Sequence, residues 1–167
     1  MDLLQQLYKI SSKSGMEGQI KSFILENLRD VDLDVKTDDI GNMFITKGLA
    51  ESYPCVAAHL DEIHSPCQRE TLVDGDIIYT VDRLWNRVGC GADDKNGLWI
   101  IMNLLQTEQI LKVALFVQEE RDGELAGCRG ARVCDLSFFS DVKFILECDR
   151  KGSSDVVYIG KGETCLC

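Results

Sequence analysis

Basic residues are outnumbered in this chain, in which 18 lysines and arginines stand against 28 aspartates and glutamates and the net charge is −10. Nucleic acids and anionic membranes bind basic surfaces, so this balance argues against both as partners. The sequence also lacks an apolar run of membrane-spanning length. Its N-terminal residues lack the basic and apolar segments of a signal peptide. These absences predict a cytoplasmic protein that does not act on a membrane.

A disulfide framework is not indicated either. Eight cysteines are present, but they are scattered through apparent strands and helices rather than concentrated in a small, loop-rich scaffold. This distribution favours reduced thiols, which agrees with a cytoplasmic protein. The 167 residues, of which 45% are hydrophobic, suffice for one domain with a proper core and are too few for two. We therefore expect a single domain over residues 1–167, and whether it forms a homo-oligomer stays open.

Three apolar runs have the length of buried strands, and each ends in ionisable side chains. The runs span residues 54–58, 113–117 and 142–146. Helical patterns separate them, and this alternation predicts a three-layer α/β/α fold with a mixed, mainly parallel sheet. Because the carboxyl ends of parallel strands meet at one edge of a sheet, the ionisable residues should converge on one crevice. These residues are His59, Asp61, Glu119, Glu120 and Asp149.

The remaining elements frame this sheet. Two amphipathic helices precede the first strand, and the residues at 31–37 and 42–47 predict an edge hairpin. A second hairpin is expected over residues 72–82, around a Val-Asp-Gly-Asp turn. We also expect a helix that begins near Asp94 and packs through Ile100, Ile101 and Leu104, a helix that carries Val133 and Leu136, and a further strand at 156–159.

The stretch from Gly89 to Gly97 places two adjacent acids, Asp93 and Asp94, between glycines. Adjacent like charges repel at a chain reversal, and burial of an unpaired carboxylate costs on the order of several kcal/mol, so a cation is the natural compensation. A pair of aspartates before a helix is also a common N-cap, and for this motif alone that structural alternative stays open.

The strand ends favour the metal site. His59 and Asp61 are two residues apart, so on an extended strand they face the same side, where an Asp61 oxygen accepts the ring proton that metal binding does not use. A histidine at a strand end is otherwise an ordinary surface residue. With Asp93 the crevice would hold five carboxylates around one imidazole, and these cannot all be ionised together without cations. Hard oxygen donors with one nitrogen suit zinc, manganese or cobalt.

Four short segments follow one another in an order that is typical of one enzyme family. They are Ala-His-Leu-Asp at 58–61, Gly-Ala-Asp-Asp-Lys-Asn-Gly at 91–97, Gln-Glu-Glu at 118–120, and Asp149. In this order they resemble the metal-site motifs of the co-catalytic zinc exopeptidases, the family of peptidase T, carboxypeptidase G and aminoacylase. The similarity extends from the N-terminal helices to Asp149, and four ordered motifs together are a specific signal.

The resemblance implies a fold, a reaction and a set of ligands. The fold is a phosphorylase/hydrolase-like domain, and the reaction is hydrolysis of an amide bond in a small peptide or an acylated amino acid. One or two Zn²⁺ ions would be bound, with Mn²⁺ or Co²⁺ as alternatives. His59 and Asp149 would bind one ion and Glu120 the other, and Asp93 would bridge them.

The resemblance also implies how the residues around the ligands act. Asp61 would orient the histidine ligand, and Glu119 would be the general base that takes a proton from water. The peptide bond between Asp93 and Asp94 would be cis.

The chain departs from the family at its C-terminal end. Family members normally supply a further histidine to the second metal, and many insert a lid domain after the segment that matches Asp149. Here eighteen residues follow Asp149, and none is histidine. The other histidine, His64, matches no family ligand and is interpreted as a surface residue, and the spacing from Glu120 to Gly130 is longer than usual. These departures support an alternative, a shortened and catalytically impaired domain that acts as a metal-binding or interaction module.

Overall fold

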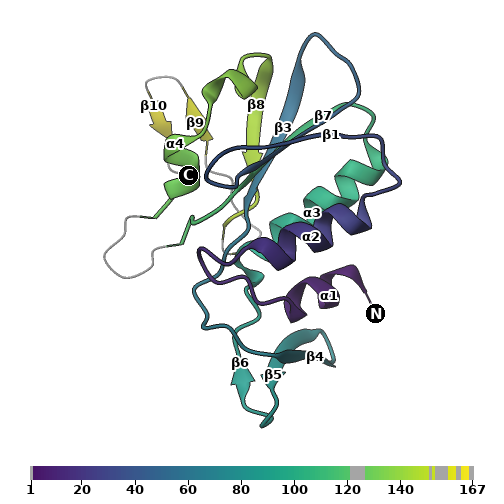
Figure 1. Ribbon diagram of the computed structural model, residues 1–167, viewed down its shortest axis with the longest axis vertical. Coiled ribbons are helices and arrows are strands. Elements are labelled where there is room, and N and C mark those ends of the chain that lie inside the picture. The colour runs from purple at the N-terminus through teal and green to yellow at the C-terminus, as the bar shows by residue number, and fades with distance from the viewer. Residues whose placement is uncertain (1, 121–126, 151, 153–157, 161–162, 166–167) are drawn as a thin grey trace.

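A computed structural model describes residues 2–120, 127–150, 152, 158–160 and 163–165 and contains a central five-stranded sheet in the order β1-β2-β7-β3-β8 (Figure 1). β3 lies between β7 and β8 and pairs in parallel with both, which confirms the three predicted parallel strands. β2 pairs antiparallel with β1 and with β7, so the first predicted hairpin is confirmed and the sheet is mixed. The bounds are β1 Asp34–Thr37, β2 Met43–Lys47, β3 Tyr53–His59, β7 Leu111–Phe116 and β8 Val142–Glu147.

Three helices lie together on one face of the sheet, namely α1 (Leu3–Lys9), α2 (Gly18–Asn27) and α3 (Ala92–Thr107) (Figure 1). Ile20 and Ile24 of α2 are fully buried in a core that they share with apolar residues of β3, β7 and α3. Each such side chain contributes roughly 1.5–3 kcal/mol when it leaves water. This core anchors α3, whose first turn carries the paired aspartates.

The buried face of α3 differs from the predicted one. Ile101 is buried as expected, but Ile100 and Leu104 are only half-buried. Residues three or four apart share one face of a helix, and the face that meets the sheet here includes Leu98, Ile101, Met102 and Leu105. The predicted buried face was therefore wrong by a shift of about one residue along the helix.

The opposite face of the sheet is covered by two short segments, α4 (Arg129–Val133) and the 3-10 helix η1 (Leu136–Phe139). Phe138 and Phe139 pack there against a small cluster that includes Phe44 and Cys55. The prediction of one helix that carries both Val133 and Leu136 was wrong, because the backbone becomes extended at Cys134 and separates them into two segments, where both side chains are exposed. The three-layer arrangement itself is confirmed, with a thin second layer.

Two smaller sheets complete the described residues. β4 (Arg69–Asp74), β5 (Ile77–Asp82) and β6 (Arg87–Val88) form an antiparallel sheet, which confirms the second hairpin. β9 (Tyr158–Gly160) pairs with β10 (Glu163–Cys165), whereas positions 156–157 of the last predicted strand lie outside the described residues. Among the described helices, none has both the length and the apolar character needed to cross a membrane. The six cysteines whose side chains are described are free thiols.

Candidate metal centre

His59, the last residue of β3, stands at the centre of the candidate site and is 1% exposed. Its Nε2 atom lies 2.8 Å from Asp93 Oδ1 and 3.8 Å from Asp149 Oδ2. Its Nδ1 atom lies 3.5 Å from Asp61 Oδ1, which is long for a hydrogen bond, and has no closer polar partner within the described residues. Carboxylates from three separate segments of the chain therefore enclose this imidazole.

Two groups of candidate metal ligands share His59. One group adds Asp93 and Asp149, the other adds Glu119 and Glu120, and within each group the ligand atoms lie within 4.8 Å of one another. The fold explains this convergence, since β3, β7 and β8 run in parallel and their carboxyl ends deliver His59, the two glutamates and Asp149 to one edge, where the first turn of α3 adds Asp93. The structure thus brings all four predicted ligands together, while the division of roles among them stays a prediction.

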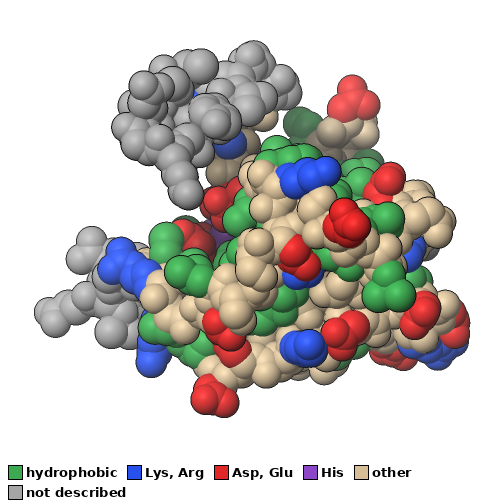
Figure 2. All heavy atoms as spheres, turned by 90° about the horizontal axis from the view of Figure 1, so that it is seen from above, with side chains coloured by type: hydrophobic (Ala, Val, Ile, Leu, Met, Phe, Trp, Pro, Cys, Tyr) green, Lys and Arg blue, Asp and Glu red, His purple; other side chains and the backbone are tan. Residues whose placement is uncertain are grey.

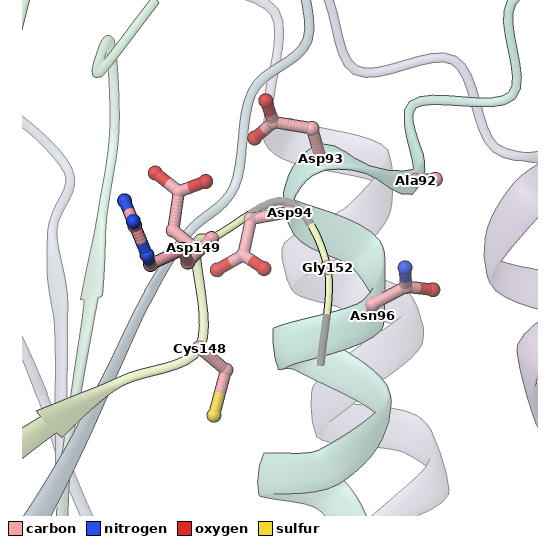
Figure 3. Close-up of a pocket in the computed structure, with 8 residues that line it drawn as sticks. Ala92, Asp93, Asp94, Asn96, Cys148, Asp149 and Gly152 are labelled. Carbon is pink, nitrogen blue, oxygen red and sulfur yellow. The ribbon is translucent and has the colours of Figure 1, made fainter. Parts of the chain in front are cut away.

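A pocket of about 450 Å³ opens beside these ligands. In Figure 3, Asp93 and Asp94 project from the beginning of α3, and Asp149 projects from the segment that follows β8. Asn96 and Cys148 also line the pocket. Figure 2 shows acidic side chains and a histidine side chain at the edge of a hollow in the surface. A small molecule can therefore reach the acidic groups from solvent.

Two of the crowded carboxylates, Asp149 and Glu120, have raised pKa values. Burial, followed by the nearby charge of Asp93, raises the pKa of Asp149 to about 6, and the same two causes raise the pKa of Glu120. Burial works to lower the pKa of His59, but its contacts with Asp61 and Asp93 outweigh this and raise the pKa to about 10. A divalent cation fits this donor set, because it supplies the positive charge that the converging carboxylates lack.

Asp61 contacts both His59, at the end of β3, and the backbone of the Glu119–Glu120 pair, after β7. Its Oδ1 atom accepts a hydrogen bond from the backbone N–H of Glu119 at 2.9 Å, and its Oδ2 atom accepts one from Glu120 at 3.0 Å. Burial works to raise the pKa of Asp61, but the contacts with His59 and the Glu119 N–H lower it below its ordinary value. Asp61 lies beside His59 as expected. In addition, it holds the segment after β7 against the end of β3, which the sequence did not indicate.

The peptide bond between Asp93 and Asp94 is cis, as predicted. The two carboxylates lie in different environments: the Asp93 side chain is 67% exposed, whereas Asp94 is 2% exposed and accepts a hydrogen bond from the Gly97 N–H at 3.0 Å. Burial raises the pKa of Asp94 to about 7. A Cβ atom on Gly97 would lie 2.5 Å from either Asp94 oxygen, so this contact requires glycine. Asp94 therefore holds the first turn of α3, and Asp93 faces the site.

A buried ionic cluster lies beside the glycine-rich loop of the site. Glu62 Oε2 lies 2.9 Å from Arg69 Nη2 and 2.6 Å from Lys95 Nζ, and all three residues are at most 2% exposed. Arg69 also donates to the carbonyl of Gly89, and Lys95 donates to the carbonyl of Cys90. Burial, followed by repulsion from Arg69, lowers the pKa of Lys95 to about 8. The cluster thus fixes the backbone immediately before the paired aspartates.

Replacement of Glu62 by glutamine should destabilise the protein by roughly 3–5 kcal/mol, because it leaves two buried cations without their counter-charge. The free energy of unfolding in urea measures this effect. Glu70→Gln is the matched control, since Glu70 is 61% exposed and pairs with Lys9 at the surface. The Glu70→Gln variant should lose less than about 1 kcal/mol of unfolding free energy. Equal losses in the two variants would contradict the assignment of the cluster as a structural element.

Sequence reasoning missed several residues that support the site. The Cys128 thiol donates a hydrogen bond to Glu119 Oε1 at 3.0 Å, and this bond raises the pKa of Cys128 to about 11. No local pattern links these two positions. The ionic cluster had a partial signal, since Lys95 lies in the Gly-Ala-Asp-Asp-Lys motif and Glu62 follows Asp61 directly. His64 is half-buried rather than fully exposed, and it belongs to neither ligand group.

Comparison with known proteins supports the fold. No family model matches the chain, and no curated protein matches its sequence. A tripeptidase structure from Staphylococcus aureus matches with a TM-score of 0.72 and 23% identity, over 89% of this chain and 42% of that protein. Aminopeptidase PepT from Bacillus cereus matches with a TM-score of 0.73 and 19% identity, over 89% of this chain and 42% of that protein. Human carnosine dipeptidase 1 matches with a TM-score of 0.64 and 17% identity, over 88% of this chain and 37% of that protein.

These likenesses show that the chain has the fold of these peptidases. They confirm the resemblance to zinc exopeptidases as far as the fold is concerned. The chain spans less than half the length of each of the three proteins, at 42%, 42% and 37%.

Proposed function

We propose that this chain is the catalytic domain of a zinc-dependent exopeptidase or amidohydrolase that hydrolyses an amide bond in a small peptide. The observation that carries the proposal is the convergence of His59 with two pairs of acids at the carboxyl edge of the sheet. The fold supports it, since the structures that share it include a tripeptidase, an aminopeptidase and a dipeptidase.

Four residues would hold one or two Zn²⁺ ions, namely His59, Asp93, Glu120 and Asp149. One imidazole nitrogen with several carboxylate oxygens suits zinc, and manganese or cobalt as alternatives. A bound divalent cation supplies Lewis acidity, which polarises the scissile carbonyl and lowers the pKa of water. Asp61 would hold His59 and the Glu119–Glu120 segment in fixed relative positions, because it contacts the His59 ring and accepts from the backbone N–H groups of both glutamates.

Glu119 is the residue that would take the proton from the attacking water. Its half-buried carboxylate belongs to one of the two groups around His59, so it reaches the same volume as the ligands. The Cys128 thiol donates to one oxygen of Glu119, which leaves the other oxygen to accept a proton. A carboxylate positioned in this way contributes general-base catalysis of about 10²–10⁴-fold.

The acidic lining of the pocket indicates which end of the substrate would enter. Three acids, Asp93, Asp94 and Asp149, and one base, Arg150, line it, and the excess of negative charge attracts the protonated α-amino group of a peptide. Its volume of about 450 Å³ suits a ligand of a few residues. We therefore place di- and tripeptides with a free amino terminus ahead of acylated amino acids, whose amino group is blocked.

Metal content and peptide hydrolysis, measured on one preparation, test this function. After dialysis against Zn²⁺, the purified chain should retain zinc by inductively coupled plasma mass spectrometry. It should release amino acids from members of a panel of di- and tripeptides, detected by liquid chromatography and mass spectrometry. A chelator should abolish both properties, and added zinc should restore them. Zinc binding without hydrolysis of any peptide or acylated amino acid would instead favour a metal-binding module.

A further inference from the structure

β8 is an edge strand with exposed apolar side chains. It pairs with β3 on one side, and within the described part of the chain no strand pairs with its other side. Phe144 is 58% exposed, Ile145 53% and Leu146 47%, whereas residues 55–59 of the neighbouring β3 are all buried. An apolar edge with unpaired backbone N–H and C=O groups is a template for pairing with another strand.

The exposed side chains lie on both faces of β8. Successive residues of a strand point to opposite faces, so Phe144 and Leu146 share one face and Ile145 lies on the other. Apolar residues on both faces are typical of a strand that is covered on both faces of its sheet. Over the residues that the structure describes, β8 therefore has the character of an inner strand that lacks its second neighbour.

The sequence of β8, Val-Lys-Phe-Ile-Leu-Glu, is complementary to itself in one antiparallel register. When two copies pair about Ile145, Lys143 lies opposite Glu147 of the second copy, and by symmetry this ion pair occurs twice. Phe144 then lies opposite Leu146, again twice, and Ile145 lies opposite its own copy. Opposite charges directly across a strand pair stabilise it, and like charges destabilise it. Charge complementarity thus selects both the partner and the register.

We propose that β8 pairs antiparallel with β8 of a second copy of this chain and joins the two central sheets into one continuous sheet, with a two-fold axis at Ile145. The same surface serves both copies, so the contact closes on itself and gives a dimer rather than a filament. The proposal stands apart from the proposed function, because none of the candidate metal ligands takes part in the pairing.

Charge reversal tests the register. Lys143→Glu and Glu147→Lys each place two like-charged pairs across the contact, so each should weaken dimerisation by about tenfold. Sedimentation equilibrium on the full chain measures the dissociation constant. The double variant exchanges the charges and should recover the affinity of the unsubstituted chain. Both side chains are exposed in the single chain, so all three variants should fold, which circular dichroism checks.

Substitution on the axis tests the contact itself. Ile145→Lys places two cations against each other and should give a monomer, whereas Leu84→Lys, at an 80% exposed apolar residue outside β8, should leave the dimer intact. A chain that is monomeric at every concentration would overturn the proposal. So would a dimer that Ile145→Lys and the single charge reversals leave unchanged, since the contact would then lie elsewhere. Single reversals that the double variant fails to rescue would overturn the register.

Discussion

Replacement of Asp93 by asparagine is expected to remove zinc from the protein. Asp93 Oδ1 lies 2.8 Å from His59 Nε2, and this carboxylate is the one proposed to bridge the metal positions. Asparagine keeps the shape of the side chain but loses its negative charge. Loss of an outer partner of a ligand alone costs roughly 10- to 100-fold in metal affinity, so loss of a bridging ligand should cost more than about a hundredfold. Isothermal titration with Zn²⁺ measures this change.

Asp30→Asn provides the matched control for this experiment. It makes the same change in net charge at a side chain that is 91% exposed and belongs to neither ligand group. Its zinc affinity should equal that of the unsubstituted chain. If the Asp93 variant also bound zinc normally, Asp93 would not be a ligand, and the proposed metal centre would have to be abandoned.

Replacement of Glu119 by glutamine should lower turnover by about a hundredfold or more and leave zinc binding nearly intact. Glutamine has almost the same shape, its Oε1 can still accept from the Cys128 thiol, and its backbone N–H can still donate to Asp61. The amide cannot take a proton from water, so the variant removes the chemistry and preserves the position. Steady-state hydrolysis of the best peptide of the panel, together with zinc content, measures both properties.

The neighbouring acid separates the two roles. Glu120→Gln should lower zinc content, because Glu120 is a proposed ligand, whereas Glu119→Gln should not. The two substitutions change the charge equally at adjacent positions, so a general electrostatic effect would act on both alike. Loss of zinc in the Glu119 variant as severe as in the Asp93 variant would show that the division of roles between the acids is wrong.

The sequence by itself determined the core of the sheet and the edge at which the site lies. The runs at 54–58 and 113–117 are apolar at every position, and the run at 142–146 is interrupted only by Lys143. Such runs are typical of parallel strands covered on both faces, and β3, β7 and β8 form at these positions. Ionisable residues begin where each run ends, so strand ends and candidate ligands could be predicted from local pattern alone. The buried face of α3 was predicted one residue out of phase, and a shift of one residue rotates a helix by about 100°.

Only the tertiary structure decided which side chains support the ligands. Asp61 bonds to the backbone of Glu119 across 58 residues of sequence, and Glu62 holds Lys95 across 33. The thiol of Cys128 contacts Glu119, nine positions earlier in the chain, and no periodic pattern marks this contact. Contacts of this kind depend on how separate elements pack, and neither the helical nor the strand repeat records them.

The edge position of β8 was also a matter of tertiary structure. A continuous apolar run has the same appearance in the sequence whether its strand has two neighbours or one, because the pattern reflects the strand's own residues and not the strands beside it. The exposure of Phe144, Ile145 and Leu146 became visible only when the order of the strands was known. Local sequence therefore specifies strands and their ends, and packing specifies which of them are left with a free edge.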